Sequence, residues 1–318
     1  MLKSLSFCTL AAVLYLVPQN LAVAGGPSVV VSINPLHSLV AGVMQGVASP
    51  MLLLTPGKTP HSYAMRPSQA QALNTAQLVV WIGPELETFL RKPIEGLPRA
   101  TRILSISKAP GIQLLKSRNG GPWAHSASDA HSHGKDHEKG HGAHGVYDMH
   151  LWLDPENAKA AIRTIKDILS EIDPANAQRY SKNARTVAAE IEALTRHIEQ
   201  QTTALKTRPY IVFHDAFQYF ERRFGLTPVG AVTINPDRKP GAKRIHDIRR
   251  RIVSHQAQCV FREPQFAPRL IETLAEDTGA RIGLLDPLGS TVAPGPAAYA
   301  QIMRNLSAAL SDCLTGKH

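Results

Sequence analysis

The order of short apolar runs and longer amphipathic runs predicts an α/β protein with two similar lobes. Each lobe is expected to hold a four-stranded parallel sheet with flanking helices, because its short runs are continuously apolar rather than alternating. One long helical pattern without Gly or Pro separates the two halves. We therefore predict two four-stranded lobes joined by a long rigid helix, with a cleft between the lobes.

The first half of the mature chain, residues 25–172, alternates strands with helices. Short apolar runs bounded by turn residues are typical of strands buried on both faces of a parallel sheet. The strands are predicted at residues 29–33, 51–54, 78–82 and 102–106, and the helices at residues 36–45, 67–75, 85–95 and 155–171.

A long helix is predicted over residues 173–208. Asp173 and Pro174 supply an N-cap and a proline at the first helical position. Apolar residues then recur at spacings of mostly three or four. About 33 residues at 1.5 Å each would span roughly 50 Å, which is longer than one small domain. We interpret this helix as a rod between two lobes, and an ordinary long surface helix is the alternative.

The second half, residues 209–318, repeats the alternation and forms a weak internal repeat of the first. Ligands of open α/β sheets bind at the carboxyl ends of the strands, so two such lobes that face each other predict a ligand-binding cleft. The strands are predicted at residues 210–213, 227–232, 259–261 and 281–285, and the helices at residues 216–224, 242–254, 266–278 and 296–314.

The first 24 residues have the pattern of a signal peptide. Lys3 supplies the positive charge, residues 5–17 the apolar core, and Ala22, Val23 and Ala24 a small-residue cleavage site. No later stretch has the roughly 18 consecutive apolar residues that a membrane-spanning helix needs. We expect a mature chain that begins at about Gly25 and is exported. Export favours a disulfide between the two remaining cysteines, Cys259 and Cys313, and buried free thiols are the alternative.

The formal net charge of +10 raises the possibility of nucleic-acid binding. Lys and Arg are dispersed along the chain, however, aromatic residues are few, and the protein is expected to be exported. The densest basic patch, residues 243–255, is better interpreted as the exposed face of a helix. We therefore exclude nucleic acid as a partner.

Six of the fourteen histidines lie in one polar segment without apolar periodicity, which predicts a mobile loop over residues 117–147. Neutral imidazole is the commonest protein ligand for zinc, copper and nickel, so this segment is a candidate auxiliary metal-binding loop. A solvated linker is the alternative. These histidines are His125, His131, His133, His137, His141 and His144.

Four further residues follow predicted strand ends, two from each half. They are His61, His150, His214 and Asp286. All four could point into one cleft, because ligands of such sheets bind at strand ends. Three imidazoles and one carboxylate suit tetrahedral zinc. The sequence therefore predicts a metal site between the lobes.

The elements TPHSYAMRPS, LVVWIGPELE, DMHLWLDPE, PYIVFHDAFQYFE and LLDPLG resemble the metal-receptor proteins of bacterial ABC transporters, above all the zinc-binding receptors of zinc importers. The resemblance covers nearly all of the mature chain, including the long helix and the paired cysteines. It implies two α/β lobes bridged by a rigid helix, with metal between them. Mapped by motif, His61, His150 and His214 match the three zinc ligands of the family. Asp286 matches an aspartate that coordinates metal in some members.

One departure concerns the residue before His61. Close zinc receptors often have an acidic residue there, whereas this chain has Pro60, so the fourth ligand is expected to be Asp286, water or a histidine of the polar segment. Manganese receptors of the family use a carboxylate where His214 stands. Three imidazoles favour zinc over manganese, which prefers oxygen donors.

The resemblance implies a non-enzymatic, monomeric receptor that captures Zn²⁺ in the periplasm. Its partner would be the membrane permease of an ABC importer with a separate ATPase subunit, since this chain has no GxxxxGK[ST] motif. A zinc hydrolase is one alternative, because three histidines with an open position also describe catalytic zinc. No HExxH motif is present, however. A surface zinc-binding adhesin or zinc chaperone is another alternative.

Overall fold

A computed structural model describes residues 25–120, 123, 146–234, 236 and 240–316. The expected signal peptide and the six histidines of the polar segment therefore lie outside the described residues. No helix in the described part of the chain is long and apolar enough to cross a membrane.

The first lobe contains a four-stranded parallel sheet in the order β2-β1-β3-β4, which confirms the prediction for this half. The central strands β1 and β3 are completely buried, as their unbroken apolar sequences predict. The strands are β1 (Val29–Val31), β2 (Met51–Leu52), β3 (Leu78–Trp81) and β4 (Arg102–Ser105), and the helices of this lobe are α1 (Asn34–Val43), α2 (Pro67–Thr75) and α3 (Arg91–Glu95).

The second lobe contains another four-stranded parallel sheet, in the order β10-β9-β7-β8. Its central strand β7 is buried at all five positions, so its last residue lies inside the molecule rather than on its surface. The strands are β7 (Tyr210–His214), β8 (Gly230–Thr233), β9 (Cys259–Arg262) and β10 (Arg281–Leu284), and the helices are α6 (Gln218–Phe224), α7 (Ala242–Ser254) and α8 (Arg269–Ala275).

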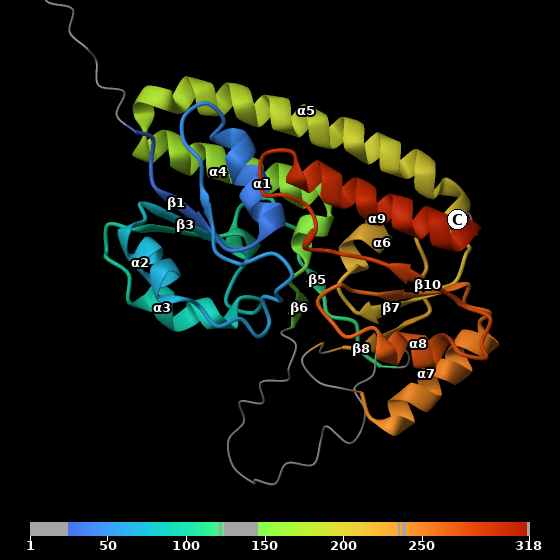
Figure 1. The fold of residues 1–318 in the computed structure, drawn as a ribbon. Helices are drawn as coiled ribbons and strands as arrows, with labels where there is room; N and C mark the ends of the chain where they lie inside the picture. The colour runs from blue at the N-terminus through green and yellow to red at the C-terminus, as the bar shows by residue number, and fades with distance from the viewer. Residues whose placement is uncertain (1–24, 121–122, 124–145, 235, 237–239, 317–318) are drawn as a thin grey trace, which may run out of the picture.

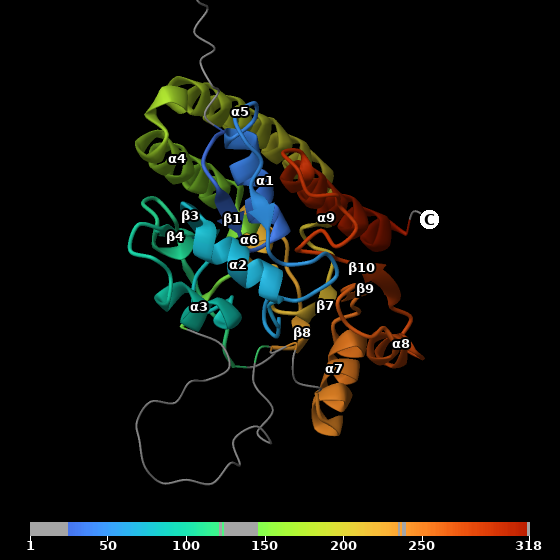
Figure 2. The same ribbon diagram turned by 60° about the vertical axis from the view of Figure 1, so that its left-hand side comes forward.

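A layer of long helices runs along one side of both lobes. The longest is α5 (Ala177–Thr202), which Figure 1 shows crossing the whole molecule above both sheets. It contacts α1 and α4 (Pro155–Ile172) of the first half and α9 (Ala298–Thr315) at the end of the second. Figure 2 shows the same layer from another side. The predicted rod is therefore confirmed, and its buried face ties the two lobes together.

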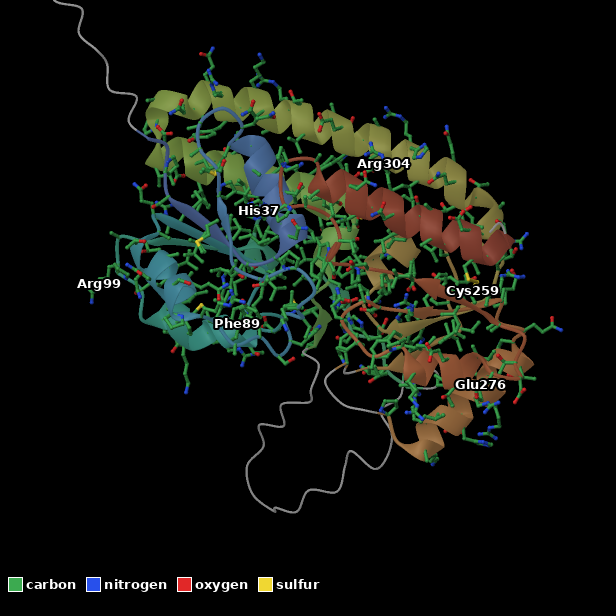
Figure 3. The ribbon with its side chains drawn as sticks, in the orientation of Figure 1. His37, Phe89, Arg99, Cys259, Glu276 and Arg304 are labelled. Atoms are coloured by element: carbon green, nitrogen blue, oxygen red, sulfur yellow. A yellow bond between two sulfur atoms is a disulfide. The ribbon has the colours of Figure 1, made fainter. Side chains whose placement is uncertain are left out.

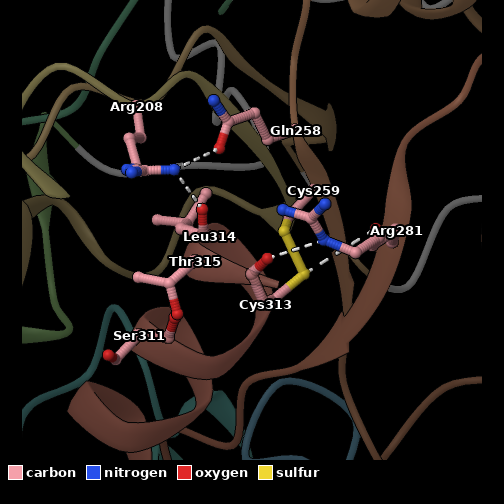
Figure 4. The surroundings of a disulfide bond; sticks show 8 residues. All are labelled: Arg208, Gln258, Cys259, Arg281, Ser311, Cys313, Leu314 and Thr315. Carbon is pink, nitrogen blue, oxygen red and sulfur yellow. Dashed lines mark hydrogen bonds between the residues drawn. A yellow bond between two sulfur atoms is a disulfide. The ribbon is translucent and has the colours of Figure 1, made fainter. Parts of the chain in front are cut away.

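A disulfide joins Cys259 to Cys313 across 54 residues of sequence. It connects the start of β9 with the last turn of α9 (Figure 4). Two arginines support the same junction. Arg281 donates a 2.8 Å hydrogen bond to the carbonyl of Cys313, and Arg208 donates one of 2.7 Å to the carbonyl of Leu314. The predicted disulfide is thus confirmed, and it fixes the C-terminal helix to the second sheet.

The predicted helix over residues 85–95 is wrong in its first half. Instead, the chain makes a short 3-10 turn at Thr88–Leu90 before α3. The cause is Glu87, whose buried carboxylate accepts hydrogen bonds from the backbone N–H groups of Ile82 and Gly83. The side chain therefore turns back onto the end of β3, and burial raises the pKa of Glu87 to about 7.

A two-stranded antiparallel ribbon was not predicted. It pairs β5 (Leu115–Lys116) with β6 (Tyr147–Asp148), on either side of the polar segment. Strands of two residues are too short to produce a detectable period in the sequence. The ribbon matters for the site, because β6 leads directly into His150.

Candidate metal centre

Three of the four predicted site residues converge between the lobes. His61 lies in the connection between β2 and α2, His150 follows β6, and His214 ends β7. One ring nitrogen from each lies within 4.8 Å of the other two, and together they form the group of metal-ligand side chains found in the described residues. His150 and His214 are buried, whereas His61 is half-buried.

The spacing of the two buried imidazoles fits a metal ion. The Nε2 atoms of His150 and His214 are 3.3 Å apart. Two nitrogens bound to one tetrahedral zinc at about 2.0–2.1 Å would lie about 3.3–3.4 Å from each other. The adjoining cavity, which all three histidines line, has a volume of about 10 Å³. That is roughly the space one water-sized sphere occupies, so the cavity suits a single ion and not an organic ligand.

Each buried imidazole is hydrogen-bonded to a buried carboxylate on the side away from the other ring. Nδ1 of His150 is 2.8 Å from Oδ1 of Asp148, and Nδ1 of His214 is 2.5 Å from Oε1 of Glu263. Burial alone would lower the pKa of His214, but the Glu263 carboxylate outweighs it and raises the pKa above its ordinary value. We refer to His150 and His214, with Asp148 and Glu263 behind them, as the carboxylate-backed pair.

Asp286, the fourth predicted site residue, lies two residues beyond the end of β10 and is not part of the histidine group. Its Oδ1 accepts hydrogen bonds from the N–H groups of Leu288 and Gly289 and from the side chain of Gln265. Its Oδ2 accepts another from the N–H of Ser290. In this structure the carboxylate therefore organises the turn over residues 286–290.

A second cavity lies on the other side of His61 and His150 and reaches the ribbon. Arg118, just beyond β5, forms ion pairs there with Asp215 and Glu221 of the second lobe, and its guanidinium stacks 3.6 Å from the ring of Trp123. Asp215 directly follows His214. These contacts place the base of the polar segment beside the site.

Sequence reasoning missed the residues that support the ligands. Glu263 directly follows β9, a predicted strand, so the rule applied to the histidines could have found it. Asp148 ends β6, which was not predicted, so no strand-end signal pointed to it.

Another histidine, His37, is also buried. It lies on α1 (Figure 3), and its Nε2 is 3.0 Å from the carbonyl oxygen of Pro50. Burial lowers its pKa, although the contact with Pro50 opposes this. Its contacts are therefore those of a packed structural residue.

Two α/β lobes bridged by a long helix, with imidazoles converging between them, define a metal-binding solute receptor. The chain belongs to the family described as zinc-uptake complex component A, periplasmic, whose model matches residues 29–313.

Curated relatives agree with this assignment. A protein of Brucella suis named high-affinity zinc uptake system protein ZnuA is 43% identical over 310 residues, which cover 90% of this chain and 91% of that protein. A protein of Yersinia pestis with the same name is 40% identical, and the match covers 98% of each chain.

Solved structures share the fold. A crystal structure of ZnuA superposes with a TM-score of 0.75 at 24% identity and covers 91% of this chain and 99% of that one. The solute-binding protein FpvC of Pseudomonas aeruginosa, in complex with Mn²⁺, also gives a TM-score of 0.75, at 21% identity, and covers 92% and 99% of the two chains.

Proposed function

We propose that the protein is a periplasmic receptor that captures Zn²⁺ with high affinity and delivers it to the membrane permease of an ABC importer. ATP hydrolysis would belong to a separate subunit. Membership of the zinc-uptake family and the names of relatives at 40–43% identity support this function. The observation that carries it is the group of three imidazoles between the lobes, with two Nε2 atoms 3.3 Å apart.

His61, His150 and His214 are proposed as the zinc ligands. Neutral imidazole favours zinc over manganese, which prefers oxygen donors. Water is one candidate for the fourth ligand. Asp286 is a weaker candidate, because four hydrogen bonds already engage its carboxylate. A histidine of the segment 124–145 remains a third candidate.

A receptor without catalytic activity fits this environment better than a zinc hydrolase. A hydrolase needs a general base aimed at the metal-bound water. The two carboxylates in contact with the proposed ligands instead accept hydrogen bonds from Nδ1 of His150 and of His214. These carboxylates therefore support the binding of the ion and not an attack by water.

The test is zinc binding by single-alanine variants at His61, His150 and His214. Each change should weaken the tight site by orders of magnitude, because it removes a direct bond to the ion. Competition against a zinc chelator would be measured in protein that lacks residues 124–145, so that weaker sites do not interfere. His197→Ala is a matched control, since His197 is exposed on α5. Unchanged affinity in any of the three variants would contradict the assignment of that ligand.

A further inference from the structure

The same hydrogen-bond arrangement occurs twice at the metal centre, once in each lobe. Oδ1 of Asp148 accepts from the backbone N–H of His150 at 2.9 Å and lies 2.8 Å from Nδ1 of the same residue. Oε1 of Glu263 is similarly placed, 3.3 Å from the backbone nitrogen of His214 and 2.5 Å from its Nδ1. One carboxylate oxygen therefore fixes both the backbone and the ring of each histidine.

This arrangement selects one imidazole tautomer. An ionised carboxylate only accepts hydrogen bonds, so Nδ1 must carry the proton, and in a neutral ring Nε2 must then carry the lone pair. The two Nε2 atoms are the ones that face each other at 3.3 Å. Both buried histidines thus present the nitrogen that a metal needs, in the orientation it needs.

The two carboxylates also place negative charge beside the site. Asp148 is 7% exposed and Glu263 is 2% exposed, so water screens neither well. Oδ2 of Asp148 has no hydrogen-bond partner among the described residues. A buried carboxylate with an unsatisfied oxygen is costly unless a positive charge lies nearby, and a divalent ion bound to the adjacent ring would supply one.

We propose that Asp148 and Glu263 are positioning residues that raise zinc affinity by fixing the tautomer and orientation of His150 and His214 and by adding negative charge behind them. This rests on the proposed zinc-receptor function. Carboxylates behind metal-bound histidines typically change metal affinity by about 10–100-fold.

The two carboxylates belong to separate structural supports, so each can be tested independently. Glu263 directly follows β9. Asp148 ends β6, and its carbonyl accepts a 2.7 Å hydrogen bond from the hydroxyl of Tyr219 on α6. The ribbon is thereby held against the second lobe, which keeps His150 close to His214. Failure of one variant to fold therefore leaves the other informative.

The experiment compares neutral isosteres with truncations. Asp148→Asn and Glu263→Gln keep a carbonyl oxygen that can accept from Nδ1 but remove the charge. Each should weaken zinc binding about 10-fold or more, with little change in the melting temperature of the zinc-free protein. Asp148→Ala and Glu263→Ala also remove the acceptor, and these should bind more weakly still. Glu87→Gln is the matched control, because Glu87 is a fully buried carboxylate that accepts backbone hydrogen bonds but contacts no histidine. Its zinc affinity should match that of the unmodified protein.

A second measurement reports on the tautomer directly. Nitrogen-15 NMR of labelled histidine in the zinc-free protein should show His150 and His214 protonated at Nδ1. The signal of the affected ring should shift toward a mixture of tautomers in each alanine variant. If the carboxylates had a purely structural role, the histidine rings in the molecules that still fold would keep the same tautomer.

The outcomes separate the two proposals. If the alanine variants of the histidines lose zinc but Asp148→Asn and Glu263→Gln bind it as tightly as the unmodified protein, the positioning role is overturned while the receptor function stands. Protonation of both rings at Nε2 would also overturn it. If the unmodified protein fails to bind zinc tightly, the receptor function itself is wrong.

Discussion

The carboxylate-backed pair and the connection that carries His61 are built in opposite ways. His150 and His214 are 6% and 3% exposed, and each is fixed by a carboxylate of its own lobe. His61 is half-buried in residues 53–66, which contain no helix or strand. Its ring centroid lies 5.8 and 5.9 Å from those of the pair, which are 5.1 Å apart. Two of the proposed ligands are therefore held by buried carboxylates, whereas the third lies on a connection without regular secondary structure, and we expect more conformational entropy to be lost there when metal binds.

The largest expected effect tests this difference directly. His61→Ala leaves the pair at its 3.3 Å spacing, whereas His150→Ala or His214→Ala leaves one fixed imidazole and one on an irregular connection. We expect the loss of zinc affinity to be at least about 10-fold greater when either member of the pair is replaced than when His61 is replaced. A preorganised site loses less conformational entropy when it binds the ion, so the remaining pair should bind zinc better than one fixed histidine with His61. Competition against the same chelator would give the zinc affinity of each of the three variants. Equal losses would mean that the two regions do not differ energetically.

The pH dependence of binding should also reflect the pair. The Glu263 carboxylate overcomes the effect of burial and raises the pKa of His214 above its ordinary value of 6.5. A proton on His214 competes with zinc, so affinity should fall as the pH falls, beginning above pH 6.5. The stability of the zinc-free protein should change in the opposite direction. The raised pKa of His214 stabilises the fold below about pH 6.5, and this contribution is lost as the pH rises through the raised pKa. Zinc titrations between about pH 5.5 and 8 would measure the first trend, and thermal unfolding of the zinc-free protein over the same pH range would measure the second. A fall that begins only well below pH 6.5 would contradict the first trend.

Asp286 should affect the fold more than the metal. Asp286→Ala removes the acceptor for the N–H groups of Leu288, Gly289 and Ser290, and unsatisfied donors cost about 1–3 kcal/mol when they cannot reach water. We expect a lower melting temperature and only a few-fold change in zinc affinity. Calorimetry with and without zinc separates the two effects. A loss of affinity as large as that of His214→Ala would make Asp286 a ligand after all.

The smallest expected effect on the tight site comes from deleting residues 124–145. Ordering a polar segment around an ion costs entropy, so its histidines should bind more weakly than the pair. The deletion should reduce the number of zinc ions bound and leave one tight site of nearly unchanged affinity. A modest weakening would identify a fourth ligand in the segment, and complete loss of tight binding would place the principal site there instead.

The sequence predicted the parts of the fold that depend on long or repeated patterns. Buried strands such as β3 and β7 are continuous apolar runs, and α5 has a clear helical period, so the two sheets and the rod follow from local sequence. The irregular start of α3 cannot be predicted from local sequence, because it depends on the hydrogen bonds that Glu87 accepts from the end of β3. The ribbon was missed because each of its strands has only two residues.

The site also has features that local sequence can predict and features that depend on the three-dimensional structure. His214 could be found because it ends a predicted strand, where ligands of α/β sheets gather. His61 and His150 lie farther from the predicted strands, and the motif resemblance supported them as well. The engagement of Asp286 with its own turn, and the pairing of Glu263 with His214 from another strand, depend on distances across the fold. Sequence patterns contain no such distances, so these details required the structure.

The ribbon also bears on how this protein could change over evolutionary time. Lys116 and Tyr147 are partners in an antiparallel pair, so the two ends of the segment between them lie side by side. A chain segment whose ends are held together can be lengthened at a small cost in free energy, because each doubling of its length adds only about 0.6 kcal/mol of loop-closure entropy. Changes in the length or histidine content of that segment should therefore leave the group of His61, His150 and His214 in place, because none of the three lies within it.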